Sequence, residues 1–173
     1  MNGRWMETEP LTIFRAERTL SSWDDTRALA GLLAKVLASG GVLLLEGPLG
    51  VGKTALTKAF CAELGVTDDV TSPTFDLLHR YDAPQVAIYH VDGYRIEDPR
   101  EWEVLDLPAP GEPHIIVVGE WSRALAPLYP QHVEVRMAFT PDGERMVQVE
   151  GAGEALSRRI YEGWERMGWA LKS

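Results

Sequence analysis

The sequence predicts an α/β fold of three layers, in which helices cover a mostly parallel sheet that ends in an antiparallel hairpin toward the C-terminus. Two short apolar runs, 86–91 and 115–118, are rich in β-branched residues and too short for helices, which is typical of buried parallel strands. A glycine-rich turn joins a third apolar run to a helix-favouring stretch. Residues 133–139 and 146–149 alternate weakly, with Pro141-Asp142-Gly143 between them, and this pattern predicts the hairpin.

The first part of the chain predicts a strand and an amphipathic helix. Residues 1–10 contain charges and no apolar run, so we expect them to be disordered, and residues 12–16 predict a short edge strand. Ser22 with Asp25 three residues later is typical of a capping box at a helix start. Apolar residues then recur at helical spacing as far as Gly40-Gly41, where the helix should end.

The strand, turn and helix around the glycines occupy roughly 42–64, and further elements follow them. Asp98-Pro99 predicts a short helix over 98–105, and a proline-rich loop at 108–113 is expected to cross the surface. An apolar stripe over 153–171 predicts a C-terminal amphipathic helix. This helix most simply packs on the protein's own core, and docking of a partner is the alternative.

Residues Gly47-Pro48-Leu49-Gly50-Val51-Gly52-Lys53-Thr54 have the spacing of a complete phosphate-binding loop. The glycines permit a turn that side chains would obstruct, and they let backbone N–H groups approach phosphate oxygens. The helix that follows directs its positive end at the same place. Lys53 can then reach the β- and γ-phosphates, and the Thr54 hydroxyl can bind Mg²⁺. The pattern predicts a P-loop NTPase fold and a nucleoside triphosphate ligand; a glycine-rich turn with a solvated lysine is the alternative.

An acidic residue ends each of the two predicted parallel strands, Asp92 in the first and Glu120 in the second. Ligands collect at the carboxyl ends of strands in an open parallel sheet, so both acids and the phosphate loop should converge on one Mg-nucleotide. Such an enzyme needs an acid to hold the metal or its waters, and one to orient or deprotonate the attacking water. The sequence does not rank the two, and either one alone could instead be a helix cap at the strand end.

Composition limits the classes of function. A length of 173 residues with 45% apolar residues suits a single domain over 1–173, and we find no repeat or linker. The formal net charge of −9 argues against a direct grip on nucleic acid, so a role on tRNA would require a partner. The single cysteine, Cys61, excludes an intrachain disulfide and is expected to be a small core residue. Since no run approaches membrane-spanning length, we expect a cytoplasmic protein without a membrane partner.

Several other side chains allow two interpretations. Ser72 and Thr74 lie where a loop could sense the γ-phosphate, yet hydroxyls beside proline are also ordinary turn residues. Trp121 either stacks near the nucleotide or fills the core, and spacing alone favours the core. The histidines show no metal-ligand spacing; we expect His90 to pack within its strand and the others to lie at the surface.

Four segments taken together resemble the TsaE family, small bacterial ATPases that serve threonylcarbamoyladenosine modification of tRNA, at the adenosine next to the anticodon. They are the loop 47–54, the segment Ser72-Pro73-Thr74-Phe75, the run 89–95 with Asp98-Pro99, and Glu120-Trp121. Their order and spacing match over roughly residues 20–150. Thr26 also falls where that family carries a threonine at the start of its first helix.

The resemblance implies a Mg-dependent ATPase with slow intrinsic turnover. It would act as a nucleotide-dependent switch on a complex of TsaD-like and TsaB-like proteins, and those partners would hold the tRNA. The residues that would hold the ATP phosphates are Gly50, Val51, Gly52, Lys53, Thr54 and Ala55.

Other site roles are implied by the same resemblance. Thr54 and Glu120 would bind Mg²⁺ directly or through water, and Asp92 would support the metal and hydrolysis. The segment 72–74 would be the nucleotide-sensing switch, with Thr74 in contact with the nucleotide. Trp121 would lie near the bound nucleotide, and the residues just before Thr26 and the turn at Gly143 would close over it.

The sequence also departs from the family pattern. Ala55 stands where another hydroxyl residue is common, and Ser122 replaces a proline after Glu-Trp. Asp76 replaces a usual hydroxyl residue, which affects the expected contacts of the switch. The proline-rich loop 108–113 replaces a Gly-Leu-Asp-like stretch and could alter partner contacts.

Two other nucleotide-dependent functions compete with the ATPase. A small-molecule kinase could use the same loop, but it would be expected to carry an arginine-bearing lid, and no lid-like insertion with clustered arginines is present. A GTPase normally needs an Asn-Lys-x-Asp guanine reader, which the sequence lacks. ATP is therefore the expected nucleotide.

Overall fold

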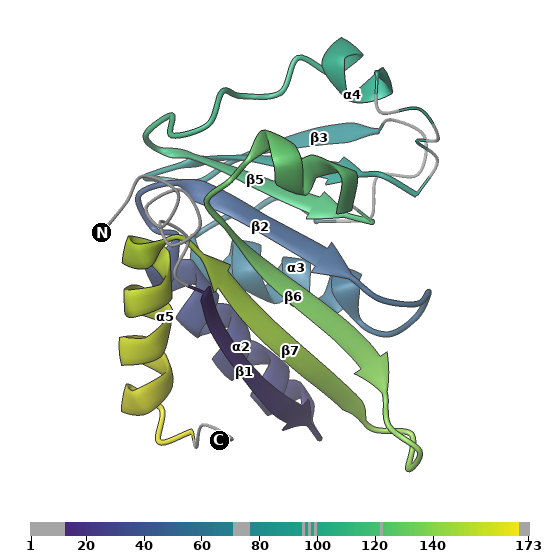
Figure 1. Cartoon of the computed structure of the whole chain (residues 1–173), viewed down its shortest axis with the longest axis vertical. Coiled ribbons are helices and arrows are strands. Elements are labelled where there is room, and N and C mark those ends of the chain that lie inside the picture. Colours follow the sequence, from purple (N-terminus) through teal and green to yellow (C-terminus); the bar gives the residue numbers. More distant parts are fainter. Residues whose placement is uncertain are drawn as a thin grey trace, which may run out of the picture.

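The computed structural model describes residues 13–70, 77–94, 96, 98, 100–121 and 123–169, and these form an α/β fold around one seven-stranded sheet (Figure 1). The expected disorder of residues 1–10 concerns a segment outside this part of the chain. The strands are β1 (Ile13–Leu20), β2 (Gly41–Glu46), β3 (Leu78–Asp82), β4 (Ala87–Asp92), β5 (Ile115–Glu120), β6 (His132–Phe139) and β7 (Arg145–Ala152). The helices are α2 (Trp23–Val36), α3 (Lys53–Glu63), α4 (Glu101–Val104) and α5 (Glu154–Arg166), with a 3₁₀ helix η1 (Arg123–Leu128).

The sheet is mixed, with the strand order β1-β7-β6-β2-β5-β4-β3. The pairs β4–β5, β5–β2 and β2–β6 are parallel, which confirms the two predicted parallel strands as β4 and β5. The pairs β1–β7, β6–β7 and β3–β4 are antiparallel, so the sheet has three parallel and three antiparallel pairs, and the expected parallel majority is not confirmed. The predicted hairpin is confirmed as β6–β7. Along β1, residue 13 pairs with 152 and residue 20 with 145, and β1 is the predicted edge strand.

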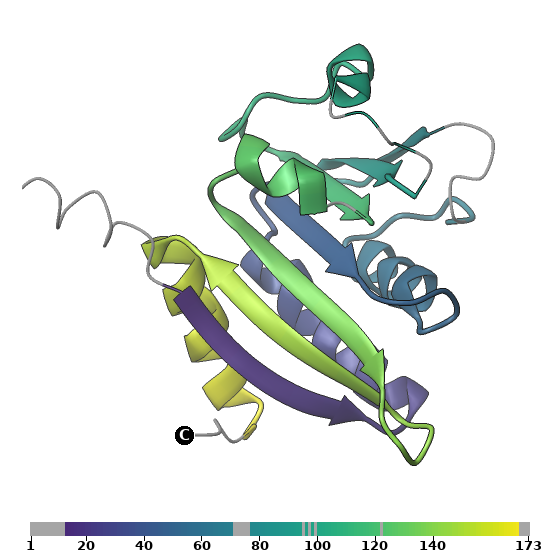
Figure 2. The same ribbon diagram turned by 45° about the vertical axis from the view of Figure 1, so that its right-hand side comes forward.

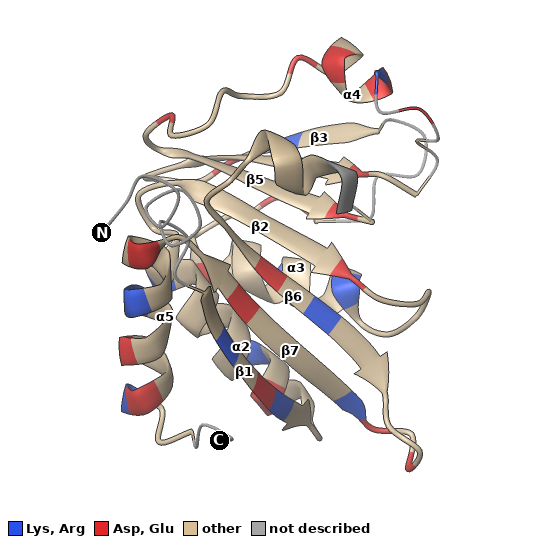
Figure 3. Cartoon of the chain, viewed as in Figure 1, with Lys and Arg blue, Asp and Glu red and all other residues tan. Residues whose placement is uncertain are grey.

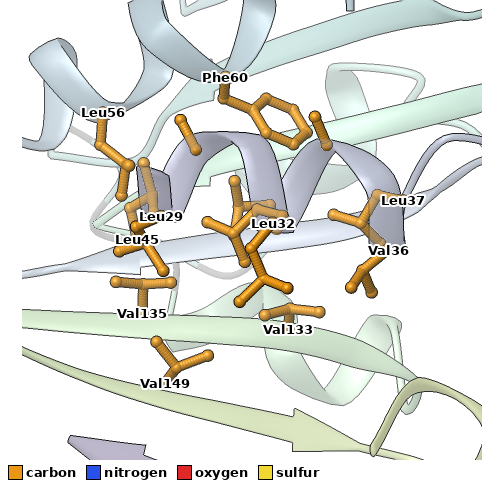
Figure 4. Packing of buried hydrophobic residues seen from close by; sticks show 14 of the residues in the cluster. Leu29, Leu32, Val36, Leu37, Leu45, Leu56, Phe60, Val133, Val135 and Val149 are labelled. Atoms are coloured by element: carbon orange, nitrogen blue, oxygen red, sulfur yellow. The ribbon is translucent and has the colours of Figure 1, made fainter. Parts of the chain in front are cut away.

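The two faces of the sheet bury separate apolar clusters. Successive residues of β2 alternate between them: Leu43 and Leu45 face one cluster, and Val42 and Leu44 face the other. The first cluster joins the sheet to α2, α3 and α5 (Figures 1, 2 and 4). On the opposite face, little of the sheet is covered by helices. Helix α4 contributes only Trp102 to the second cluster, and the other covering residues come from η1 and the loops.

Helix α2 begins as the sequence predicts. The Ser22 hydroxyl accepts a hydrogen bond from the Asp25 backbone N–H at 3.2 Å, and the Asp25 carboxylate in turn accepts one from the Ser21 backbone N–H at 2.8 Å. These reciprocal bonds satisfy N–H groups at the helix start. Leu29 and Leu33 of α2 are fully buried in the first cluster, and Figure 4 shows Leu29 among its side chains.

Strand β3 and helix α4 differ from the expected elements. The sequence does not predict strand β3, because the segment has no apolar run. Only Tyr81 among its five residues is buried. Helix α4 covers 101–104 rather than 98–105, since the Asp98 side chain accepts a hydrogen bond from the Arg100 backbone N–H at 2.9 Å and forms a turn before the helix.

Helix α5 ends at Arg166 rather than at 171, and the residues after 169 lie outside the described part of the chain. Gly168, at φ 73°, donates its N–H to the Glu165 carbonyl, and Trp169 donates to the Trp164 carbonyl. This Schellman arrangement satisfies the last carbonyls and turns the chain away. The rings of Trp164 and Trp169 pack at 4.8 Å between centroids, which closes the motif with an apolar contact.

Cys61 is fully buried in α3, as expected for a core residue. Among the described residues, the longest and most apolar helices still fall short of what crossing a bilayer requires.

Candidate functional site

The glycines of the phosphate loop make the turn between β2 and α3. Gly47, Gly50 and Gly52 have φ angles of 150°, 77° and 120°, a region that other residues rarely adopt. A Cβ on Gly47 would lie 2.6 Å from the carbonyl oxygen of Met137 in β6, so this position needs glycine. Gly52 is the N-cap of α3, where no side chain caps the helix and the first turn holds no acidic residue. The positive end of α3 therefore faces the loop without a neutralising side chain from its own first turn.

The loop is anchored at its base and open at its tip. Val51 is fully buried, whereas Gly50 is exposed and Leu49 has an exposed fraction of 69%. Thr54 and Ala55 are half-buried in the first turn of α3. A ligand at this loop would thus bind at an open edge of the sheet.

The three neighbouring parallel strands β2, β5 and β4 each end in an acidic residue at that edge of the sheet. Glu46 is the last residue of β2, Asp92 of β4 and Glu120 of β5, and Figure 3 shows acidic positions at these strand ends. Asp92 is directly opposite Glu120 in the parallel pair β4–β5, and Glu120 is opposite Leu45 of β2. The structure therefore brings the two predicted acids and the phosphate loop together.

The ends of β4 and β5 approach each other closely at Gly93. Its backbone N–H donates to the Glu120 carbonyl at 2.7 Å. A Cβ on Gly93 would lie 2.7 Å from the Trp121 carbonyl oxygen and 2.8 Å from the Trp102 ring. The absence of a side chain at this position lets the strand ends that carry Asp92 and Glu120 stay in register.

Lys53 lies at the centre of this group. Its ammonium donates hydrogen bonds to the backbone carbonyls of Gly47 and, at 3.1 Å, of Pro48, so it folds back over the loop. Burial lowers the pKa of Lys53, while the negative charges of Glu120, Glu46 and Asp92, in that order of strength, act to raise it. This edge of the sheet therefore holds a buried cation on which three carboxylates act.

Trp121 contacts Lys53 rather than filling the deep core. The Lys53 ammonium lies 3.8 Å from the centroid of the Trp121 ring, a cation–π distance, and the Tyr94 ring packs on Trp121 at 5.1 Å between centroids. Trp121 has a φ of 55°, rare for a residue with a side chain, directly after the end of β5. Its backbone N–H donates to the Leu45 carbonyl at 3.1 Å, which fixes it beside the loop.

His90 does more than pack within its strand. Its Nε2 lies 2.7 Å from Oε2 of Glu120, and both side chains are buried. The sequence carries no signal for this contact, since the two residues belong to different strands. Glu46 and its effect on Lys53 are also missing from the sequence prediction, although its position directly before Gly47 is the signal that could have revealed it.

Arg145 is a further residue that the sequence prediction lacks. It begins β7, and its Nε lies 3.4 Å from the point that a Cβ on Gly52 would occupy. Gly143 lies in the exposed β6–β7 turn at φ 81°, two residues before this arginine. Thr26 is buried in the first turn of α2. Ser72 and Thr74 lie outside the described residues, so the structure gives no position for the expected switch.

A cavity of about 520 Å³ lies away from this group. Its lining includes Gly41 and Ile115 at the amino ends of β2 and β5, Pro110 and Tyr129, and Arg159 of α5. Since β2 and β5 are parallel, this cavity is at the edge of the sheet opposite the phosphate loop and the acids.

Comparisons with known proteins show the family to which the chain is similar. A family model for the threonylcarbamoyl adenosine biosynthesis protein TsaE matches residues 20–147. The tRNA threonylcarbamoyladenosine biosynthesis protein TsaE of Bacillus subtilis is 37% identical over 131 residues, covering 75% of this chain and 82% of that protein. The protein of the same name from Mycobacterium bovis is 40% identical over 129 residues, covering 69% and 76%. The crystal structure of YdiB from Bacillus subtilis superposes with a TM-score of 0.70 and 26% identity, covering 90% of this chain and 98% of that one.

The matched range runs from the last residue of β1 into β7, so it includes the phosphate loop, both acids and Trp121. The resemblance drawn from the four sequence segments is thereby confirmed. This chain belongs to the TsaE family of threonylcarbamoyl adenosine biosynthesis proteins.

Proposed function

We propose that the protein is a Mg-dependent ATPase required for threonylcarbamoyladenosine modification of tRNA. The observation that carries this proposal is the position of Lys53, which lies at a phosphate-binding loop with Glu120, Glu46 and Asp92 close enough to act on its pKa. A loop of this sequence followed by a helix is built to hold the phosphates of a nucleotide. Acids at the neighbouring strand ends add the groups that hydrolysis needs.

The residues at this edge fit Mg²⁺ bound together with a nucleotide. No group of three or more His, Cys, Asp and Glu side chains that could hold a metal by itself occurs in the described part of the chain. Mg²⁺ usually takes one or two carboxylates plus substrate phosphates and waters, so such a group is not required. Thr54 and Glu120 are the residues that would hold the ion, with Asp92 in support. When bound, Mg²⁺ would neutralise charge on the β- and γ-phosphate oxygens.

The chain's own groups would then act in defined ways. Lys53 would leave the Gly47 and Pro48 carbonyls and donate to phosphate oxygens, and the exposed N–H groups of the loop would donate to the same phosphates. The carboxylate of Asp92 would accept hydrogen bonds from water beside the phosphates and orient it. Trp121, beside Lys53, would shield the ammonium from bulk water.

Within this proposal, hydrolysis switches a complex of TsaD-like and TsaB-like proteins, and the tRNA is bound by those partners. The formal net charge of −9 supports contact with proteins rather than with the polyanionic tRNA. The free, buried Cys61 is compatible with the reducing cytoplasm, where we expect the protein to act.

The proposal is tested by replacing the central cation. Lys53→Ala should abolish Mg-ATP hydrolysis, because the phosphates lose the group that reaches them from the loop, while the far-ultraviolet circular dichroism stays unchanged. Lys58→Ala, on the exposed side of the same helix, is the matched control and should hydrolyse ATP at the wild-type rate. Phosphate release by folded Lys53→Ala at the wild-type rate would overturn the site assignment.

A further inference from the structure

His90 and Glu120 form a buried hydrogen bond directly beneath the candidate site. The imidazole Nε2 lies 2.7 Å from Oε2 of Glu120, and the side chains are 0% and 4% exposed. His90 is two residues before Asp92 on β4, so both side chains are on the same face of the sheet. The hydrogen bond therefore joins β4, which ends in Asp92, to the Glu120 side chain at the end of β5.

The bond has one direction when Glu120 is ionised. A carboxylate has no proton to donate, so the imidazole Nε2–H is the donor and Oε2 accepts. The other ring nitrogen, Nδ1, is buried and has no hydrogen-bond partner among the described residues. Leaving a buried polar atom unpaired costs stability. An apolar side chain such as Ile88, two residues earlier on the same face, would serve packing alone better.

The imidazole is held in place from the edge of the sheet. The Tyr81 ring of β3 lies beside it, with ring centroids 6.3 Å apart and a tilt of 39°, and Tyr81 is itself buried. The Tyr81 hydroxyl lies 3.3 Å from Nδ1 of His79, which is two residues earlier on β3 and directly opposite His90. Strand β3 thus fixes the ring that contacts Glu120, although it carries none of the predicted site residues.

We propose that His90 is a positioning residue for Glu120. Its Nε2–H holds Oε2 and so fixes the carboxylate, leaving Oε1 as the oxygen that serves the magnesium of a bound Mg-nucleotide or its waters. This inference rests on the proposed function. Residues that hold a metal-binding carboxylate by hydrogen bonding change metal affinity or activity about 10- to 100-fold when they are replaced.

The test separates the donor from the bulk of the side chain. His90→Gln places an amide N–H donor at a similar reach, whereas His90→Leu removes the donor. His90→Asn, whose amide is shorter, provides a second donor-displacing variant if His90→Leu does not fold. Ile88→Ala is the control: it weakens the same face of the same strand, and Ile88 is a fully buried apolar residue without a polar atom to offer Glu120.

The readout is the affinity for a non-hydrolysable ATP analogue, measured by calorimetry with Mg²⁺ and again with EDTA. We expect His90→Leu, or His90→Asn, to bind the analogue about tenfold more weakly than wild type with Mg²⁺ and with unchanged affinity in EDTA. His90→Gln should stay near wild type, and Ile88→Ala should lower the midpoint of thermal unfolding without changing the ratio of the two affinities.

Two results would overturn the inference. The first is that His90→Leu, or His90→Asn, has the same ratio of affinity with Mg²⁺ to affinity in EDTA as wild type. The second is that Ile88→Ala changes this ratio as much as the His90 variant does. Failure of the proposed function looks different, because wild type itself would then not bind the analogue under either condition. Wild-type binding with an unchanged ratio in the His90 variants removes only the positioning role.

Discussion

The thiol of Cys61 is kept in its neutral form by its surroundings in α3. Burial raises the pKa of Cys61 from the model-compound value of 9.0 to about 12. Because the folded-state pKa is above the unfolded one, the fold favours the protonated thiol. Its contribution to stability is complete below pH 9 and is lost as the pH rises toward 12.

This pKa shift predicts a pH-dependent difference between wild type and Cys61→Ala. Ionisation of the unfolded thiol should lower the free energy of unfolding of wild type by about 2 kcal/mol between pH 8 and pH 10.5. Cys61→Ala carries its packing loss at every pH, so its own fall over this range should be smaller by that amount. Urea unfolding at the two pH values measures both, and parallel curves for the two proteins would contradict the prediction.

Individual side chains differ in how far the sequence could place them. Lys53 and Thr54 could be assigned from the loop pattern, because fixed offsets along one turn determine what they face. Asp92 and Glu120 could be brought to one edge, because parallel strands end together. The His90–Glu120 hydrogen bond and the approach of Arg145 to Gly52 depend on strand neighbours distant in sequence, and no local pattern encodes them.

Two glycines differ in whether the structure has room for a side chain in their place. Gly31 lies in the interior of α2, where a Cβ would make an ordinary contact of 3.8 Å with the Glu63 side chain. Gly93 follows β4, where a Cβ would meet the backbone of Trp121 at 2.7 Å. Alanine is thus compatible with the first position and obstructed at the second.

We predict opposite signs for the two substitutions. Gly31→Ala should raise the free energy of unfolding by about 1 kcal/mol, because alanine favours the helix and its Cβ makes only an ordinary contact with the Glu63 side chain. Gly93→Ala should lower it by about 1–3 kcal/mol, since the ends of β4 and β5 must separate, and it should also slow ATP hydrolysis. Urea unfolding and phosphate release test both variants; a Gly93→Ala protein as stable and active as wild type would refute the close-approach argument.

The success of the sequence prediction for each helix or strand follows from how much of it is buried. Strands β4 and β5 could be predicted because their continuous apolar runs reflect burial on both faces. Strand β3 escapes prediction because it is held at the sheet edge by pairing with β4 rather than by an apolar face of its own. The end of α5 at Arg166 could have been anticipated from Gly168 just after it, whereas the apolar residue Leu171 beyond that glycine suggested a longer helix.

For the molecule as a whole, the acidic surface and the open phosphate loop suit a protein whose cycle is set by a partner. Under the proposed function, a complex of TsaD-like and TsaB-like proteins should raise phosphate release several-fold without any small-molecule acceptor. Lys53→Ala in the same mixture is the control for phosphate released by the complex itself. A phosphorylated metabolite among the products would instead favour the kinase, and an unchanged rate would contradict the switch.

Strand β1 has a consequence for the order in which this protein can be completed. Residues 13–20 pair along their whole length with residues 152–145, and the Phe14 N–H donates to the hydroxyl of Ser157 in α5. During translation, β1 therefore has no strand to pair with until residues 145–152 have left the ribosomal tunnel, because β7 is the strand beside it in the sheet. Strand β1 is thus made well before β7 but can pair only after it, so this contact between distant parts of the sequence is expected to form late in folding.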